Sequence, residues 1–286
     1  MKTKSLFKKL GLVATVAAVA VTSVFGLTAC DKKDTEFKAN LLTGVETEKY
    51  AFCVKEGNTT LKAELDEFFN KETTKVAVQT SLAFHNGESK TTIEYPDLSD
   101  NTGKTITMVT EAGFAPYEYT VTEGVGSIGT VGGVDVELMM LFCESKNYKL
   151  EMKDVNFDTI PAEVNKSDTN VGAAGMTITA EREEVVDFAV PYIETKQYVI
   201  SGASKDFKDI KELKDKKIGV QDGTTGNMLV ENAMKGTEDG GTGELVSDKT
   251  KLTTYKKVSV AFQDLVNGKL DAIVIDEFVE IVLVDN

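Results

Sequence analysis

Residues 173–192 read AAGMTITAEREEVVDFAVPY and contain Arg182, the one arginine in a chain that otherwise uses lysine for its positive charges. A guanidinium group meets a carboxylate with two parallel hydrogen bonds and keeps its charge when it is partly buried. The single departure from lysine therefore indicates a position that binds an anion in a fixed geometry.

The sequence around Arg182 predicts a helix that begins just before it. Thr179 can act as the N-cap, and Glu181, Glu183 and Glu184 crowd the first turn, where the helix dipole favours acids. An arginine in that turn opposes the dipole, which indicates a compensating ligand anion. The alternative is a surface Arg182 paired with a neighbouring glutamate, and position alone does not separate the two.

Residues 1–29 are predicted to be a removable leader. Four lysines among the first nine residues are followed by an apolar, Ala/Val-rich stretch over residues 10–26 and then by Leu-Thr-Ala-Cys at residues 27–30. This arrangement resembles a bacterial lipoprotein signal peptide, which implies cleavage before Cys30, acylation of its sulfur and a tether over residues 30–36. An ordinary signal peptide or a membrane span is the alternative, and the apolar stretch is short for a span.

The chain is acidic, with a net charge of −14 at pH 7, and loss of the leader would remove four further positive charges. This balance argues against nucleic acid or an anionic surface as a partner. Cys53 and Cys143 lie in apolar surroundings and are predicted to be buried thiols rather than a disulfide. Metal-ligand and thiol-redox spacings are lacking in the sequence, and the length favours two lobes.

Strand-like runs alternate with helix-like runs, which predicts an α/β architecture. Strands are expected at residues 105–110, 117–122, 130–134, 149–153, 170–174, 197–200, 217–220 and 271–275. Helices are expected at residues 136–143, 159–164, 207–213, 225–235 and 258–266. Residues 86–103 are predicted to be a linker, and residues 235–250 a solvated loop.

The segment GVGSIG at residues 124–129 matches the G-x-G-x-x-G fingerprint of dinucleotide-binding sites. That fingerprint must end a strand and open a helix, and the following Thr-Val-Gly-Gly cannot begin a helix. We interpret the segment as a hairpin turn, and we expect no cofactor.

Four segments carry motifs in a fixed order. They are FAPYEY at residues 114–119, GVDVE at 133–137, AGMTITAER at 174–182 with VDFAVPY at 186–192, and GVQDGTTG at 219–226 with DAIVIDE at 271–277. Each is moderately specific alone, and four in order are very specific. From residue 105 to residue 277 the chain resembles the amino-acid-binding type II extracellular substrate-binding proteins, which are the capture subunits of ABC importers.

The resemblance implies a two-lobed type II periplasmic-binding-protein fold, with two crossover strands and a ligand cleft between the lobes. Family members continue past the position of Glu277 with elements that resemble residues 37–44 and 48–65 of this chain. The domain is therefore expected to be circularly permuted, which surface loops and neighbouring termini permit. The alternative is that residues 37–85 are an unrelated extension.

The permuted arrangement predicts the domain boundaries. Lobe 2 would comprise residues 37–48 and 196–286, and lobe 1 residues 49–195, with the linker at 86–103 inside it.

The resemblance also implies how the zwitterionic end of an amino acid is held, since both charges need partners when they leave water. Arg182 would clamp the α-carboxylate, and Ala174, Gly175 and Thr177 would lie near it in lobe 1.

In lobe 2, Thr224 and Thr225 would hold the same carboxylate at a helix start. Asp276 would bind the α-ammonium. Thr225 and Asp276 could instead be N-caps, or serve in both ways.

The ligand side chain would lie among Glu111, Phe114, Phe157 and Gln221. The two phenylalanines could equally be plain core residues. An acid and an amide indicate a polar side chain, and a cationic one is among the candidates.

The expected function is capture of a free amino acid by a lipid-anchored monomer on the outer face of the membrane, for an ABC permease and its ATPase. A dehydratase-like enzyme on the same fold and a ligand-sensing surface lipoprotein are the alternatives. An enzyme is not expected, since nothing resembles a nucleophile–base pair and the single histidine, His85, has no partner carried by a motif. An acid–base role for Glu111 stays open.

Overall fold

The computed structural model describes residues 36–121, 127–128, 130–235 and 243–277. Several predicted segments lie outside the described residues. They are the leader, all of the tether except residue 36, most of the turn at 124–129, and residues 278–286 of the second lobe.

Along the chain, single strands or short groups of strands are separated by helices. The strands are β1 (Phe37–Leu41), β2 (Glu48–Tyr50), β3 (Cys53–Lys55), β4 (Thr105–Thr110), β5 (Gly113–Phe114), β6 (Glu118–Thr120), β7 (Ser127–Ile128), β8 (Val131–Gly132), β9 (Lys149–Asp154), β10 (Asn170–Gly172), β11 (Val186–Phe188), β12 (Ile193–Thr195), β13 (Gln197–Gly202), β14 (Lys217–Gln221), β15 (Lys251–Tyr255) and β16 (Ala272–Asp276). The helices are α1 (Thr59–Phe69), α2 (Glu72–His85), α3 (Val134–Lys146), α4 (Ile160–Val164), α5 (Ala180–Glu183), α6 (Thr225–Lys235) and α7 (Val258–Val266), with short 3-10 turns η1 (Phe157–Thr159) and η2 (Ile210–Leu213).

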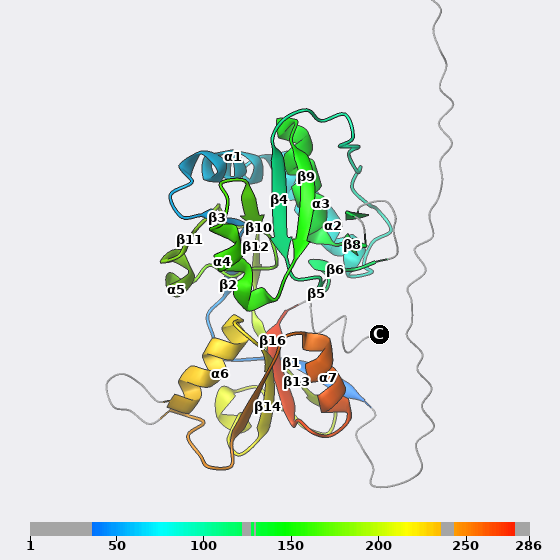
Figure 1. Ribbon diagram of the computed structural model, residues 1–286. Helices are drawn as coiled ribbons and strands as arrows, with labels where there is room; N and C mark the ends of the chain where they lie inside the picture. The colour runs from blue at the N-terminus through cyan, green and yellow to red at the C-terminus, as the bar shows by residue number, and fades with distance from the viewer. Residues whose placement is uncertain (1–35, 122–126, 129, 236–242, 278–286) are drawn as a thin grey trace, which may run out of the picture.

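Two sheets form the centres of two lobes, which Figure 1 shows one above the other. The sheet of lobe 1 has the order β11-β3-β10-β4-β9 and lies with helices α1 to α5; the sheet of lobe 2 has the order β1-β13-β16-β14-β15 and lies with α6 and α7. Strands β2 and β12 pair with each other at the boundary between the lobes. The predicted two-lobed α/β fold is confirmed.

Residues 37–85 contribute to both sheets. Strand β1 pairs antiparallel with β13 in lobe 2, and β3 lies between β10 and β11 in lobe 1 and pairs antiparallel with both. Helix α1 buries Leu61, Leu65, Phe68 and Phe69, and the ring of Phe69 lies 5.0 Å from that of Phe52. This N-terminal segment is therefore part of the core.

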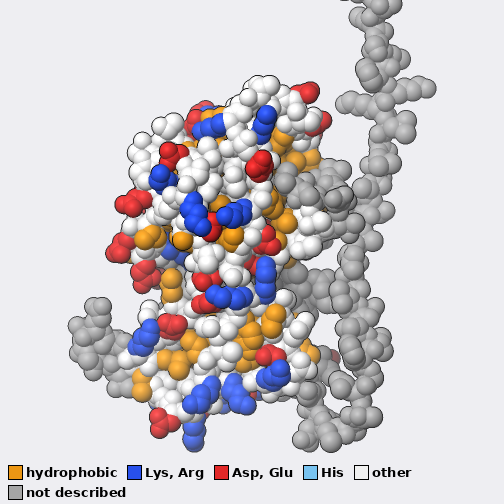
Figure 2. Space-filling view, in the orientation of Figure 1, with side chains coloured by type: hydrophobic (Ala, Val, Ile, Leu, Met, Phe, Trp, Pro, Cys, Tyr) orange, Lys and Arg blue, Asp and Glu red, His pale blue; other side chains and the backbone are white. Residues whose placement is uncertain are grey.

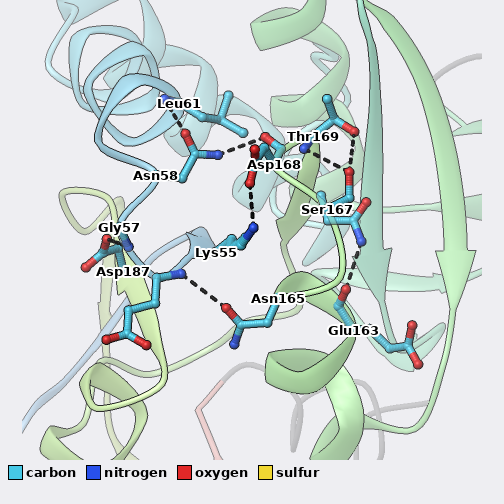
Figure 3. Close-up of polar contacts among 12 residues, drawn as sticks. Lys55, Gly57, Asn58, Leu61, Glu163, Asn165, Ser167, Asp168, Thr169 and Asp187 are labelled. Carbon is cyan, nitrogen blue, oxygen red and sulfur yellow. Dashed lines mark hydrogen bonds and ion pairs between the residues drawn. The ribbon is translucent and has the colours of Figure 1, made fainter.

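Polar contacts fasten the start of α1 to the rest of lobe 1 (Figure 3). Asn58 caps the helix by accepting from the Leu61 amide at 3.3 Å, and its own amide donates to the Asp168 carbonyl at 2.8 Å. Lys55 forms an ion pair with Asp168 at 2.8 Å, and the Gly57 amide donates to Asp187 at 2.8 Å. The cap thus satisfies helix-end groups and also joins segments that lie far apart in sequence.

The predicted elements agree with the structure where the hydrophobic pattern is strong. The bounds of β4, α6 and α7 match the predicted ranges, and β6 pairs with β8 as the expected hairpin requires. Cys53 and Cys143 are buried free thiols, as predicted.

One expected helix was wrong in extent, and some strands were not predicted. Residues 251–255 form β15, although a strand was not predicted there. The helix predicted at 207–213 is limited to η2, because a capping box between Asp209 and Glu212 begins the turn only at Ile210.

His85 has buried partners that no motif indicated. Its Nδ1 lies 2.9 Å from the Tyr119 hydroxyl and its Nε2 lies 2.9 Å from Glu137 Oε1, which also accepts from the Tyr95 hydroxyl at 2.8 Å. The histidine thus joins α2, β6 and α3 to the segment 86–103.

None of the helices in the described ranges has both the length and the apolar character needed to cross a bilayer.

Candidate functional site

Arg182 lies at the boundary between the lobes. Thr179 caps α5, as predicted, by accepting from the Arg182 amide at 3.2 Å. The Arg182 side chain donates from Nη1 to the Thr177 carbonyl at 2.6 Å and from Nη2 to the Gly223 carbonyl at 3.0 Å. Since Thr177 belongs to lobe 1 and Gly223 to lobe 2, the guanidinium contacts both halves of the molecule.

The burial of Arg182 excludes the surface alternative. The residue is only 6% exposed, and its Cζ lies 5.3 Å from the centre of the Phe157 ring. Burial lowers the pKa of the guanidinium, while the Asp276 and Glu48 carboxylates oppose this effect. Arg182 forms no ion pair with an acid in the part of the chain that the structure describes, so its charge can still receive a carboxylate.

Glu48 lies among the hydroxyls that were expected to bind a ligand carboxylate. Its Oε2 accepts from Thr177 Oγ1 at 2.7 Å and from Thr225 Oγ1 at 2.8 Å. Its Oε1 accepts from the Gln197 amide at 3.1 Å. A side-chain carboxylate of the protein thus bonds to hydroxyls from both lobes, and this acid was missed in the sequence.

Asp276 ends β16 at the same place. It is 4% exposed, lies opposite Gln197 in the strand register, and accepts from the Gln197 amide at 2.6 Å. Burial and the nearby Glu48 raise the pKa of the Asp276 carboxyl well above its ordinary value. Two carboxyl groups that share one amide donor would be stabilised by a cation between them.

A tight loop places Gly175 against aromatic rings. Its φ is +53°, and a Cβ at this position would lie 2.9 Å from Phe114 and 3.1 Å from Tyr50, so only glycine fits. The Gly175 amide donates to Asp135 Oδ2 at 2.9 Å, and the Tyr192 hydroxyl donates to Asp135 Oδ1 at 2.6 Å. The Gly175 amide is therefore bonded to Asp135 in this structure.

Asp135 should make stability depend on pH. Burial raises its pKa to about 7, against about 3.9 in an unfolded chain, so the folded state holds the proton more tightly. Its contribution to the free energy of unfolding should be largest below about pH 4, fall as the pH rises to about 7, and stay level above. The difference in urea stability between wild type and Asp135→Asn, measured from pH 4 to 8, should follow this course. A difference that grows with pH would contradict it.

Glu111 and Gln221 meet across the lobes, as expected for the walls of one pocket. Glu111 is fully buried and accepts from Gln221 Nε2 at 3.0 Å. Lys257, just before α7, forms an ion pair with Glu111 Oε1 and was not predicted. Phe114 stacks on Tyr117 with ring centres 6.0 Å apart.

Two other predicted residues have structural roles. The Thr224 hydroxyl accepts from the Asn227 amide at 3.2 Å and so caps α6, while Thr225 bonds to Glu48; the N-cap predicted as an alternative for Thr225 therefore lies one residue earlier. Ala174 is fully buried in the cluster that contains Phe157. The structure therefore brings Arg182, Thr177, Thr225 and Asp276 around one network, and Glu111 and Gln221 into another.

Charged side chains also join the lobes at the surface. Lys256 pairs with Asp158 of lobe 1 at 2.9 Å and with Asp222 of lobe 2 at 2.7 Å. On the face shown in Figure 2, basic and acidic side chains are interspersed. Over the described ranges, His, Cys, Asp and Glu do not form a group of three or more suited to a metal ion.

Comparison with known sequences gives one family. Residues 106–281 match the bacterial extracellular solute-binding proteins, family 3. The chain is 32% identical over 180 residues to a probable histidine-binding protein of Neisseria gonorrhoeae, covering 63% of this chain and 61% of that protein. It is 26% identical over 181 residues to the arginine-binding extracellular protein ArtP of Bacillus subtilis, covering 63% of this chain and 64% of ArtP. The chain thus spans less than two thirds of these relatives.

Solved structures agree with this fold. An ancestral arginine-binding protein bound to glutamine has a TM-score of 0.55 at 31% identity, covering 64% of this chain and 74% of that one. Holo ArgBP from T. maritima has a TM-score of 0.53 at 28% identity, covering 63% of this chain and 73% of that one.

Proposed function

Because the chain belongs to the bacterial extracellular solute-binding proteins of family 3, we propose that it captures a free amino acid in the cleft between its lobes and delivers it to an ABC importer. The observation that carries this proposal is the buried Arg182, which bonds to carbonyls of both lobes and lacks an acid partner among the described residues. Close by, Glu48 and Asp276 share the Gln197 amide. One anion receptor and one cation receptor suit a zwitterion.

The contacts suggest how the ligand enters. Its α-carboxylate would take the place of Glu48 at the Thr177 and Thr225 hydroxyls and bond to Arg182. Its α-ammonium would bind Asp276 and stabilise that carboxylate in the ionised form. Because these groups come from both lobes, the ligand would shift an open–closed equilibrium toward the closed state.

A thermal-shift screen tests the proposal. Saturation with the cognate amino acid at about 100 times its Kd should stabilise the folded state by about 2.7 kcal/mol and raise Tm. The N-acetylated form of the same amino acid lacks the ammonium charge and serves as the control. If none of the twenty amino acids raised Tm, the proposal would be wrong, and consumption of an added amino acid would favour the enzyme alternative.

Three further features belong to this proposal. The Leu-Thr-Ala-Cys sequence at residues 27–30 supports a lipid anchor on Cys30 at the outer face of the membrane. The partners would be an ABC permease and its ATPase, and the protein would act as a monomer. The contribution of residues 37–85 to both sheets supports a circularly permuted domain, with lobe 2 over residues 37–48 and 196–286 and lobe 1 over residues 49–195.

A further inference from the structure

The ion pair between Glu111 and Lys257 lies in the region where the ligand side chain is expected. Glu111 follows β4 in lobe 1 and is fully buried, while Lys257 precedes α7 in lobe 2 and its side chain is 35% exposed. Gly113 makes the approach possible, because a Cβ there would lie 2.9 Å from Glu111 Oε1 and 3.1 Å from Lys257 Cδ. Asp154 Oδ1 is 3.9 Å from the Lys257 ammonium and is half-exposed.

This pair changes the charge that a ligand meets. A buried carboxylate without a partner would attract a guanidinium or ammonium side chain. Here Lys257 already supplies the positive charge, so an arginine or lysine ligand would have to displace it from Glu111. A second acid, Asp154, is too exposed to neutralise the Lys257 charge fully or to attract a cationic ligand strongly.

Two groups beside Glu111 keep hydrogen-bonding capacity, the Gln221 side-chain oxygen as an acceptor and the Lys257 ammonium as a donor. Gln221 Nε2 faces two acceptors, Glu111 Oε2 at 3.0 Å and the Lys256 carbonyl at 3.3 Å, which fixes the orientation of the amide. Gln221 Oε1 is consequently turned away from them; it is buried and has no hydrogen-bond partner in the described part of the chain. The Lys257 ammonium has three N–H donors, and Glu111 is its one hydrogen-bond acceptor among those residues.

We propose that Lys257 determines ligand preference and makes this cleft a site for an amino acid with a neutral carboxamide side chain, glutamine or asparagine; this inference rests on the proposed amino-acid-binding function. The ligand amide oxygen would accept from Lys257, and the ligand amide nitrogen would donate to Gln221 Oε1. A carboxylate side chain would satisfy Lys257 but would face Glu111 and leave Gln221 Oε1 unpaired.

Isothermal titration calorimetry with glutamine, asparagine, glutamate, aspartate, arginine and lysine tests the proposal. In the wild type, one of the two amides should bind roughly tenfold or more tightly than arginine or lysine. In Lys257→Met, which keeps the aliphatic stem, the preferred amide should bind roughly tenfold more weakly and the cationic amino acids more tightly. Lys256→Met is the matched control, because Lys256 also pairs with acids of both lobes and its loss should leave the amide-to-cation ratio unchanged.

The outcomes separate this inference from the function on which it rests. The inference is overturned if wild type prefers a cationic or acidic amino acid, or if Lys257→Met leaves the preference unchanged. If none of the twenty amino acids raises Tm in the wild type, the amino-acid-binding function itself fails, and this inference fails with it.

Discussion

Replacement of Arg182 by alanine is expected to weaken amino-acid binding by about 3–5 kcal/mol, which is on the order of 150- to 5000-fold. The ligand carboxylate would enter a buried environment with hydroxyl donors but without its opposite charge. The wild-type guanidinium is in place to receive it, since its hydrogen bonds to the Thr177 and Gly223 carbonyls hold it between the lobes. Calorimetry with the amino acid that gives the largest thermal shift measures the loss.

Arg182→Lys is the matched control for charge. The lysine side chain keeps the positive charge but cannot form two parallel hydrogen bonds with a carboxylate. The affinity of Arg182→Lys for the ligand should therefore lie between those of the wild type and Arg182→Ala. Circular dichroism should confirm that both variants fold. If Arg182→Ala bound the ligand as tightly as the wild type, the assignment of Arg182 to the binding site would be wrong.

A chain without residues 37–85 is expected not to fold. Deletion removes β3 from between β10 and β11, removes the β1 edge of lobe 2, and exposes the core beneath α1. Burial of one large apolar side chain contributes about 1.5–3 kcal/mol, so the loss of Leu61, Leu65, Phe68 and Phe69 alone approaches the whole stability of a typical domain. Cooperative urea unfolding, followed by circular dichroism, should be absent.

The same segment attached behind residue 286 supplies the control. If the domain is circularly permuted, a chain that runs from residue 86 to residue 286 and continues through a flexible linker into residues 37–85 should fold cooperatively and bind the ligand like wild type. If the deleted chain instead folds with wild-type affinity, residues 37–85 are an extension and the permutation proposal is wrong.

Strong local patterns made much of the fold predictable. The apolar stripe of α7 and the alternation in β4 defined these elements without tertiary information. Strand β15 has the burial pattern of a mostly exposed edge strand, so its sequence lacked the apolar alternation on which a prediction depends. The helix at η2 is shorter than predicted because its N-cap is Asp209, which lies two residues after the predicted start. Helix boundaries depend on such local contacts.

The site was predictable only where one residue carried an unusual signal. Arg182 stood out because it is the one arginine of the chain and lies in a first helical turn, where the dipole opposes a cation. Lys257 lies at the N-cap of α7, so it is also a cation at the start of a helix. It was nevertheless overlooked, because lysine is common in this chain. The roles of Glu48 and His85 could not be predicted, because their partners are distant in the sequence. The partners of Glu48 lie 129 and 177 residues away, and those of His85 lie 34 and 52 residues away.

Strand β2 lies at the boundary between the lobes and carries Glu48, whose carboxylate accepts from Thr225 of lobe 2. A change in the interlobe angle therefore moves the Glu48 carboxylate relative to Thr225, even if no side chain changes rotamer. If an incoming carboxylate displaced the Glu48 side chain, the force on that side chain would act directly on strand β2, which lies at the boundary between the lobes. The radius of gyration in solution scattering should consequently respond to the charge at residue 48 as well as to ligand.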